Sequence, residues 1–232
     1  MALVGIVAGG VGSRMGGDMP KQFLDLCGEP VIIHTIRRFA MHEDISDIIV
    51  GINPDWYDYM KELADKYFDA GIHLTKGGSD RNGTITNIIK YAEEILGAGE
   101  DEILLTHDAV RPFVNRKMID DSIAAMEYCE ICTAALPATD TIVLSTDAKT
   151  VSDFPLRENM FRVQTPQTFR LGSFMKMLNS VSPQEREKIT DACKLFYMNG
   201  RKVYIIEGAE TNIKLTYPSD FETAKVFMRH NA

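Results

Sequence analysis

The sequence lacks the features that mark secreted, membrane-bound and disordered proteins. Its 232 residues include only four cysteines and one tryptophan. The charge-free stretch over residues 1–13 is too short to span a bilayer and has no basic flank of the kind that signal peptides carry. Hydrophobic residues make up 45% and charged residues 25%, which is ordinary for a globular domain. We therefore expect a folded cytoplasmic protein without membrane contacts.

The four cysteines are too few for a disulfide framework and suit a reducing compartment. Cys129 and Cys132 have the spacing of a redox motif or of half a zinc site. No second cysteine pair or histidine pair accompanies them. We interpret the two residues as small apolar side chains at a junction between a helix and a strand.

Basic residues are also in the minority. The chain has 25 lysines and arginines against 33 acidic residues, which gives a net charge of −8. A polyanion such as DNA would meet a repulsive field, so no nucleic-acid partner is expected. A local basic pocket could still bind a small anion.

Short apolar runs alternate with longer segments of helical periodicity. This alternation predicts a Rossmann-like, doubly wound α/β fold with a mostly parallel sheet. We expect strands at 3–8, 47–52, 72–75, 102–106, 131–136 and 202–207, and helices at 31–41, 55–70, 84–96, 117–128, 171–180, 183–199 and 218–230.

The alternation stops between residues 137 and 165. This segment has two polar, β-rich runs at 140–146 and 150–154, separated by a turn. We expect a protruding β-hairpin arm within a single domain that covers residues 1–232. Exposed strand edges need a cover, and an identical arm from a second subunit would supply it. The arm therefore predicts a homodimer with arm exchange.

A glycine-rich loop follows the first expected strand. A dinucleotide-binding fingerprint beginning at Gly10 would need a small residue where Met15 stands, and no Gly-Lys-Ser/Thr motif of a P-loop is present. The loop instead carries Arg14 and, seven residues later, Lys21. Two cations on a glycine-rich turn of an acidic protein suggest a polyphosphate subsite, although either could be a solvated surface charge.

Six ordered motifs make a family resemblance specific. They are Ala8-Gly9-Gly10-x-Gly12-Ser13-Arg14-Met15-Gly16 with Pro20-Lys21-Gln22, Gly77-Gly78-Ser79-Asp80-Arg81, His107-Asp108-Ala109-Val110-Arg111-Pro112-Phe113, Gln164-Thr165-Pro166-Gln167-Thr168-Phe169, Thr190-Asp191-Ala192-Cys193-Lys194 and Asn212-Ile213-Lys214-Leu215-Thr216. Together they resemble the cytidylyltransferases that act on methylerythritol 4-phosphate and on ribitol 5-phosphate. The resemblance implies transfer of a cytidylyl group from CTP to a polyol phosphate, with Mg²⁺ as cofactor.

Two motifs favour D-ribitol 5-phosphate as the acceptor. Val110 and the residues that follow Asp191 are similar to the ribitol branch, whereas the methylerythritol branch usually has alanine at the first position and a second acidic residue at the other. The resemblance then implies CDP-ribitol as product, for teichoic acid or another cell-envelope polymer. Methylerythritol 4-phosphate remains the alternative acceptor, and a non-catalytic nucleotide-binding paralogue is the alternative of a different class.

The resemblance also implies roles for individual residues. Arg14, Lys21 and Lys214 would be catalytic cations on the phosphates, and Asp108 would hold Mg²⁺ unless it only caps a turn. The CTP site would comprise Val7, Ala8, Gly9, Gly10, Gly78, Ser79, Asp80, Arg81, Asn82, Gly83 and Thr84. Arg81 could instead pair within its own loop, and Thr84 could also cap its helix.

The acceptor would need an anion site of its own. The resemblance assigns it to Arg111, Thr141, Arg157, Thr165 and Thr190, with Arg157 coming from the neighbouring subunit. An ion pair of Arg157 with Glu158 or Asp153 is the alternative. His107 is expected to be packed at a strand end, because a phosphate nucleophile is already ionised and needs no general base.

Overall fold

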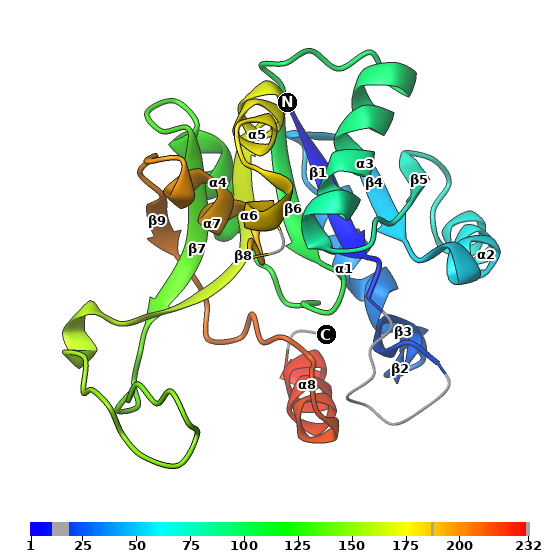
Figure 1. The fold of residues 1–232 in the computed structure, drawn as a ribbon. Coiled ribbons are helices and arrows are strands. Elements are labelled where there is room, and N and C mark those ends of the chain that lie inside the picture. Colours follow the sequence, from blue (N-terminus) through cyan, green and yellow to red (C-terminus); the bar gives the residue numbers. More distant parts are fainter. Residues whose placement is uncertain (11–18, 187, 231–232) are drawn as a thin grey trace.

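A seven-stranded sheet forms the centre of the molecule in the computed structural model, which describes residues 1–10, 19–186 and 188–230 (Figure 1). The strand order is β5-β4-β1-β6-β8-β7-β9. The strands are β1 (Ala2–Ala8), β4 (Ile45–Ile52), β5 (Ile72–Lys76), β6 (Ile103–Asp108), β7 (Ile131–Pro137), β8 (Phe161–Arg170) and β9 (Tyr204–Glu207). A short hairpin of β2 (Asp25–Leu26) and β3 (Glu29–Pro30) lies apart from this sheet.

The sheet is mostly parallel, as predicted. β1 pairs in parallel with β4 and β6, β4 with β5, and β7 with β9. β8 runs antiparallel to both of its neighbours, β6 and β7. In the register, Val7 of β1 lies opposite Gly51 on one side and Asp108 on the other. The carboxyl ends of β1, β4 and β6 therefore meet at one edge of the sheet.

Helices cover both faces of the sheet, which confirms the doubly wound α/β architecture (Figure 1). They are α1 (Val31–Ala40), α2 (Tyr57–Tyr67), α3 (Arg81–Ile95), α4 (Arg116–Ala125), α5 (Leu171–Asn179), α6 (Pro183–Arg186), α7 (Ala192–Met198) and α8 (Pro218–His230). Successive strand residues point to opposite faces, so Val4 joins one hydrophobic core with α1 while Leu3 joins a second with α3. No helix in the described part is long and apolar enough to cross a membrane.

One predicted helix and one unpredicted strand differ from the expected pattern. The helix predicted over 183–199 is broken into α6 and α7, because the Asp191 side chain accepts a hydrogen bond from the Lys194 amide at 2.8 Å and so starts a new helix. β8 was not predicted, since it is rich in polar residues and has Pro166 within it. Its pairing with β6 and β7 provides the stabilisation that its sequence pattern does not reveal.

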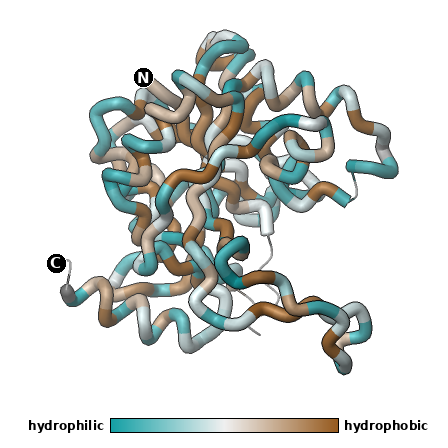
Figure 2. The backbone as a smooth tube through the Cα atoms, turned by 90° about the vertical axis from the view of Figure 1, so that its left-hand side faces the viewer, coloured by the Kyte–Doolittle hydropathy of each residue, from teal (hydrophilic) through white to brown (hydrophobic). Residues whose placement is uncertain are grey.

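The segment between β7 and β8 projects from the body of the molecule (Figure 1). The two runs predicted as strands are not regular strands, and only an isolated bridge joins Leu144 to Asp153. The turn between them does form, because the Asp147 carboxylate accepts hydrogen bonds from the amides of Lys149 and Thr150. Figure 2 shows hydrophobic stretches along this projecting segment, to which we refer as the arm (residues 138–160).

Candidate active site

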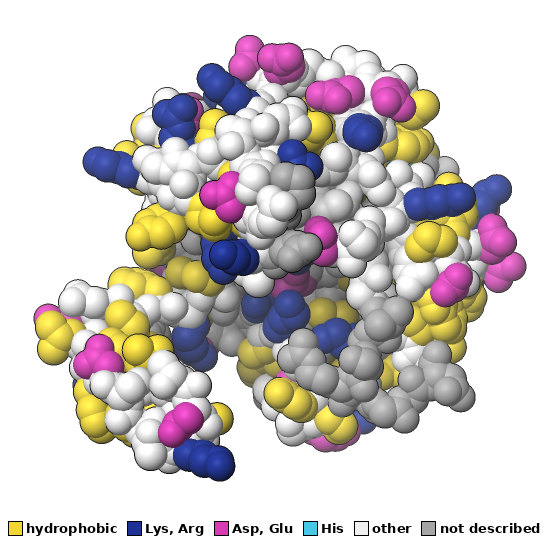
Figure 3. All heavy atoms as spheres, in the orientation of Figure 1, with side chains coloured by type: hydrophobic (Ala, Val, Ile, Leu, Met, Phe, Trp, Pro, Cys, Tyr) yellow, Lys and Arg dark blue, Asp and Glu magenta, His cyan; other side chains and the backbone are white. Residues whose placement is uncertain are grey.

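A pocket of about 420 Å³ opens at the carboxyl ends of the parallel strands. The chain reverses its direction of winding between β1 and β6, and open α/β sheets bind their ligands at such a switch point. Figure 3 shows Lys and Arg side chains gathered in the hollow beside the arm. The pocket is lined by Val7, Ala8, Gly9, Gly10, Lys21, Gln22, Gly78, Ser79, Asp80, Arg81, Thr84, Asp108, Ala109, Val110 and Lys214.

Thr84 holds the second glycine-rich loop (residues 77–83, after β5) in shape. Its hydroxyl accepts a hydrogen bond from the Gly78 amide at 3.0 Å and donates one to the Asp80 carbonyl at 2.9 Å. A Cβ atom on Gly78 would lie 2.4 Å from the backbone carbon of Gly83, and one on Gly9 would lie 3.0 Å from the Thr84 hydroxyl. The second loop is therefore folded too tightly for a side chain at Gly78. The first loop lies close to it, because a Cβ atom on Gly77 would be 3.2 Å from the Cα of Gly9. Part of the pocket wall is therefore made of backbone groups.

Gln22 supports the first glycine-rich loop, a role that sequence reasoning missed. Its side chain is almost fully buried, and its Nε2 donates to the carbonyls of Ala8 at 3.1 Å and Gly10 at 3.3 Å. The one sequence signal for this role was the place of Gln22 in the Pro20-Lys21-Gln22 motif, directly after the lysine. Gln22 thereby connects the backbone around Ala8 to the turn that carries Lys21.

Asp108 is the centre of an ion cluster at the pocket. Arg81 Nη1 contacts its Oδ1, while Arg111 Nε and Lys214 Nζ lie 3.2 and 3.0 Å from its Oδ2. The Asp108 side chain is only 8% exposed, so these contacts lie in a region of low polarity. Three cations thus surround one carboxylate, and the cluster has an excess of positive charge.

The charges around Asp108 determine its protonation state. Burial alone raises the pKa of Asp108, but the positive charges of Arg81, Lys214 and Arg111 outweigh burial and hold that pKa well below its usual range. The carboxylate is therefore ionised at neutral pH. Arg81 has two further guanidinium nitrogens that are buried without a hydrogen-bond partner, so donors remain for an anionic ligand.

Asn212 positions the segment that carries Lys214. Its Nδ2 donates to the backbone carbonyl of Thr165 at 2.9 Å. The backbone carbonyl of Asn212 accepts a hydrogen bond from Arg111 Nη1 at 2.8 Å. The Leu215 amide donates to the Val110 carbonyl at 2.9 Å, which brings the residue after Lys214 against the end of β6. Asn212 belongs to one of the sequence motifs, and its complete burial and its hydrogen bonds give it a structural role.

The structure brings together most of the residues predicted to bind CTP. Nine of these eleven line the pocket, whereas Asn82 and Gly83 do not. Arg81 does not pair within its own loop, because its partner is Asp108 on β6. The helix α3 begins at Arg81 rather than at Thr84, and its cap is Asp80, whose side chain accepts from the Gly83 amide at 2.7 Å. Arg14 lies outside the described residues.

The residues predicted to bind the acceptor are divided between two regions. Arg111 and Thr165 are buried next to Asp108, whose amide donates to Thr165 Oγ1 at 3.2 Å. Thr190 is exposed on the loop before α7. Thr141 and Arg157 are exposed on the arm, where Arg157 contacts the Thr139 carbonyl at 3.5 Å. The arm residues are not among those that line the pocket of their own chain.

His107 is a packed residue at the end of β6, as predicted. It is fully buried against the ring of Phe39, and Nε2 lies 3.1 Å from the Arg111 carbonyl. Burial lowers the pKa of His107 to about 3, so the ring is neutral at physiological pH. His107 is therefore placed to support Arg111 and not to accept a proton from a substrate.

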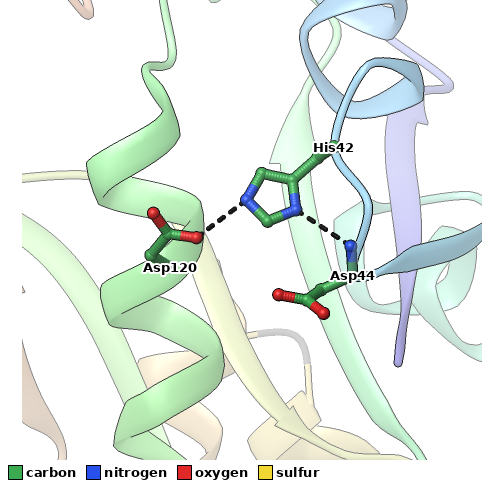
Figure 4. A group of neighbouring side chains, drawn as sticks. All are labelled: His42, Asp44 and Asp120. Carbon is green, nitrogen blue, oxygen red and sulfur yellow. Dashed lines mark hydrogen bonds and ion pairs between the residues drawn. The ribbon is translucent and has the colours of Figure 1, made fainter.

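A second group of polar side chains has the composition of a metal site. Among the described residues, His42, Asp44 and Asp120 have potential ligand atoms within 4.8 Å of one another (Figure 4). Both ring nitrogens are already used, since His42 Nε2 lies 2.9 Å from Asp120 Oδ1 and Nδ1 accepts from the Asp44 amide at 3.2 Å. This group joins the turn after α1 to α4 as a structural contact.

Comparison with known proteins gives consistent results along the whole chain. Residues 1–230 match the family model described as "IspD: 2-C-methyl-D-erythritol 4-phosphate cytidylyltransferase". A protein of Streptococcus pneumoniae serotype 2 (strain D39 / NCTC 7466), named ribitol-5-phosphate cytidylyltransferase, is 41% identical over 229 residues, which is 97% of each chain.

Solved structures show the same likeness. The 4-diphosphocytidyl-2C-methyl-D-erythritol synthase of Anaerococcus prevotii DSM 20548 superimposes with a TM-score of 0.80 at 26% identity, over 99% of this chain and 98% of that one. The 2-C-methyl-D-erythritol 4-phosphate cytidylyltransferase of Francisella tularensis gives a TM-score of 0.81 at 25% identity, over 97% and 99%.

Proposed function

The chain belongs to the 2-C-methyl-D-erythritol 4-phosphate cytidylyltransferase family, and we propose that it transfers the cytidylyl group of CTP to D-ribitol 5-phosphate. The observation that carries the proposal is the ion cluster of Asp108, Arg81, Arg111 and Lys214 beside a pocket with a backbone wall. The near full-length likeness to ribitol-5-phosphate cytidylyltransferase favours ribitol 5-phosphate over the methylerythritol acceptor.

In this reaction a phosphate oxygen of the acceptor attacks the α-phosphorus of CTP. One P–O bond forms, the bond to the β-phosphate oxygen breaks, and pyrophosphate leaves with the electron pair. Positioning and charge stabilisation dominate such transfers. Lys21 and Lys214 line the pocket and are placed to stabilise the phosphate charges, and Arg14 is proposed to join them.

The backbone walls of the pocket suit a pyrimidine. Gly9 and Gly78 present backbone groups where a side chain would be excluded by close approach, and Ala8 lines the pocket beside them. Backbone donors and acceptors can pair with the amino and carbonyl groups of cytosine. A narrow space between the two glycine-rich loops leaves less room for a purine. We therefore place the base between the two glycine-rich loops.

Asp108 is the residue proposed to hold Mg²⁺ with the triphosphate. An ionised carboxylate is a ligand that Mg²⁺ prefers, and the ion commonly takes one or two protein carboxylates plus substrate phosphates. Asp80 also lines the pocket, but it caps α3. The donor set therefore fits a metal bound mainly through CTP. When bound, Mg²⁺ would neutralise charge that develops on the phosphates.

The acceptor phosphate is proposed to bind near Arg111, Thr165 and Thr190. These residues lie around the end of β6 and the loop before α7. Thr141 and Arg157 would complete the site from the arm of a neighbouring subunit. Free thiols at all four cysteines agree with a cytoplasmic location, where the product would serve teichoic acid or another cell-envelope polymer.

Pyrophosphate release is the experiment that tests this function. The protein is incubated with CTP and Mg²⁺ and either ribitol 5-phosphate or methylerythritol 4-phosphate, with Mg²⁺ omitted in a parallel sample. We expect fast release with ribitol 5-phosphate and Mg²⁺. Faster release with methylerythritol 4-phosphate would reverse the choice of acceptor. Binding of CTP without release in any sample would favour a non-catalytic paralogue.

The arm supports the proposal of a homodimer. Its exposed apolar side chains include Phe154 and Leu156, which are 67% and 66% exposed, together with Val143, Leu144 and Val151. Monomeric proteins rarely expose contiguous apolar surface of this kind. In a symmetric dimer, the same arm of a second copy would cover these side chains, and no other partner protein would be needed.

Mixing two inactive variants tests whether the arm completes a neighbouring site. If Arg157 acts across the interface, a heterodimer of Lys21→Ala and Arg157→Ala subunits has one intact site. Random pairing should then restore about a quarter of wild-type turnover. Each variant refolded alone is the control. No recovery in a mixture that contains heterodimers by mass spectrometry would show that Arg157 acts within its own chain.

A further inference from the structure

The loop before α7 is held against the first turn of α3. Ile189 is 5% exposed and packs in the core that also contains Ile85 and Ile89 of α3. The next residue, Thr190, is exposed. Asp191 then caps α7. Thr190 is therefore displayed from a short loop whose two sides are both fixed.

Asn82 supplies the polar contact between α3 and this loop. Its Nδ2 donates to the Ile189 carbonyl at 3.1 Å. This hydrogen bond is buried, and the two residues are 107 positions apart in the sequence. The residue Asn82 is 6% exposed, and its Oδ1 is buried without a hydrogen-bond partner. A buried amide oxygen without a partner lowers the stability of the fold. A side chain that only joined α3 to the loop would not need to carry such an oxygen.

The same turn of α3 also contacts the nucleotide side of the site. Asp80 lines the pocket, and Arg81 contacts Asp108. Asn82 is the next residue and faces the other way, toward the loop of Thr190. One helical turn thus contacts the proposed nucleotide pocket, the ion cluster and the proposed acceptor loop.

We propose that Asn82 is a positioning residue for the acceptor phosphate, acting through the Ile189 carbonyl on Thr190. This inference rests on the proposed function, because it assumes that Thr190 contacts that phosphate. It also reassigns Asn82, which sequence motifs placed with the CTP ligands. The hydrogen bond keeps the acceptor loop in register with Arg81 and hence with the nucleotide.

Kinetics of Asn82→Ala measure this role. We expect the KM for ribitol 5-phosphate to rise about tenfold, with the KM for CTP changed less than twofold, because one buried hydrogen bond to the acceptor loop is lost. Asn82→Asp keeps the shape but removes the donor, so it should shift the same constant. Asn87→Ala is the matched control: Asn87 is on the same helix, and its Nδ2 donates to the Lys76 carbonyl at 2.9 Å.

A double variant distinguishes action through Thr190 from a separate effect. If Asn82 acts by placing Thr190, the rise in acceptor KM for Asn82→Ala with Thr190→Ala should be smaller than the product of the two single effects. A multiplicative result would show that the two residues act independently. An equal rise in both KM values for Asn82→Ala would return Asn82 to the nucleotide site. Either result overturns the proposal.

Hydrogen exchange separates this inference from the proposed function. In Asn82→Ala the backbone amides over residues 188–194 should exchange faster than in wild type, and those in Asn87→Ala should not. Unchanged exchange would overturn the proposal whatever the kinetics. Wild-type protein that turns over neither acceptor would overturn the proposed function and the acceptor role of Asn82, while the exchange data would still decide whether Asn82 holds the loop.

Discussion

Asp108→Asn is expected to lose turnover by on the order of 10²-fold or more and to lose about 3 to 5 kcal/mol of stability. The substitution keeps the shape of the side chain and removes its charge. Arg81, Arg111 and Lys214 then face one another without the carboxylate that they share. Since the Arg81 and Arg111 side chains are only 19% and 11% exposed, solvent does little to screen the repulsion between these two cations. Steady-state kinetics and urea unfolding measure the two effects.

An exposed ion pair provides the control. Asp121 lies 2.7 Å from Lys117 one turn away on α4, and the lysine side chain is 64% exposed. Asp121→Asn should change stability by less than about 0.5 kcal/mol and leave turnover unchanged. If Asp108→Asn behaved in the same way, the ion cluster would have neither the energetic nor the functional role given to it.

The pH dependence of stability gives the sign of the effect. The native pKa of Asp108 is lowered relative to the ordinary value of about 3.9 in an unfolded chain. Its contribution is therefore complete at neutral pH, where both states are ionised, and is lost as the pH falls below about 4 toward the native pKa. The stability difference between wild type and Asp108→Asn should shrink over that acidic range. A difference that grew on acidification would contradict the lowered pKa.

Much of the fold could be predicted because its strands are buried on both faces. Runs such as 3–8 and 47–52 are apolar apart from Asp47, and they match β1 and the later part of β4. β8 escaped because its ladder partners, and not its own composition, make it a strand. The arm was predicted as a projecting segment, but its irregular backbone was not: its two β-rich runs are joined only by the isolated bridge between Leu144 and Asp153.

The site could be predicted as a set of motifs but not as a set of contacts. Spacing places Gly9, Gly78 and Asp108 at strand ends, and parallel strands bring those ends together. Which way a side chain points from the first turn of α3 depends on where that helix begins. A start at Arg81 instead of Thr84 directs Arg81 to Asp108 and Asn82 to Ile189, and these two contacts could not be read from sequence.

The distribution of charge also becomes clear only in three dimensions. The chain has a net charge of −8, yet Lys21, Arg81 and Lys214 all line one pocket. A triphosphate would meet a local positive field in a molecule that repels larger polyanions. The contribution of each cation to catalysis depends on how firmly the chain positions it. Lys21 is carried on a well-packed turn, so its removal is the most informative test.

Lys21→Ala is expected to lower kcat on the order of 10²-fold or more while changing CTP affinity less. Lys21 begins a short helical turn, Lys21–Phe23, that is firmly held. Gln22 donates a hydrogen bond to the Ala8 carbonyl in the first glycine-rich loop. The centroid of the Phe23 ring lies 5.3 Å from that of Trp56 and 5.1 Å from that of Tyr59. A cation carried on a turn held in this way can stabilise charge that develops on the phosphates during transfer, which is an effect on kcat more than on binding.

The control for this variant is a lysine remote from the pocket. Lys61 is exposed on α2, and Lys61→Ala should leave both kcat and CTP affinity unchanged. Lys21→Arg should recover only part of the lost turnover, because a planar guanidinium does not reproduce the compact ammonium charge. Single-turnover kinetics with saturating CTP and isothermal titration with CTP separate the two effects. A variant with normal single-turnover rate and weakened CTP binding would make Lys21 a ground-state contact and leave charge stabilisation to Lys214 and Arg81.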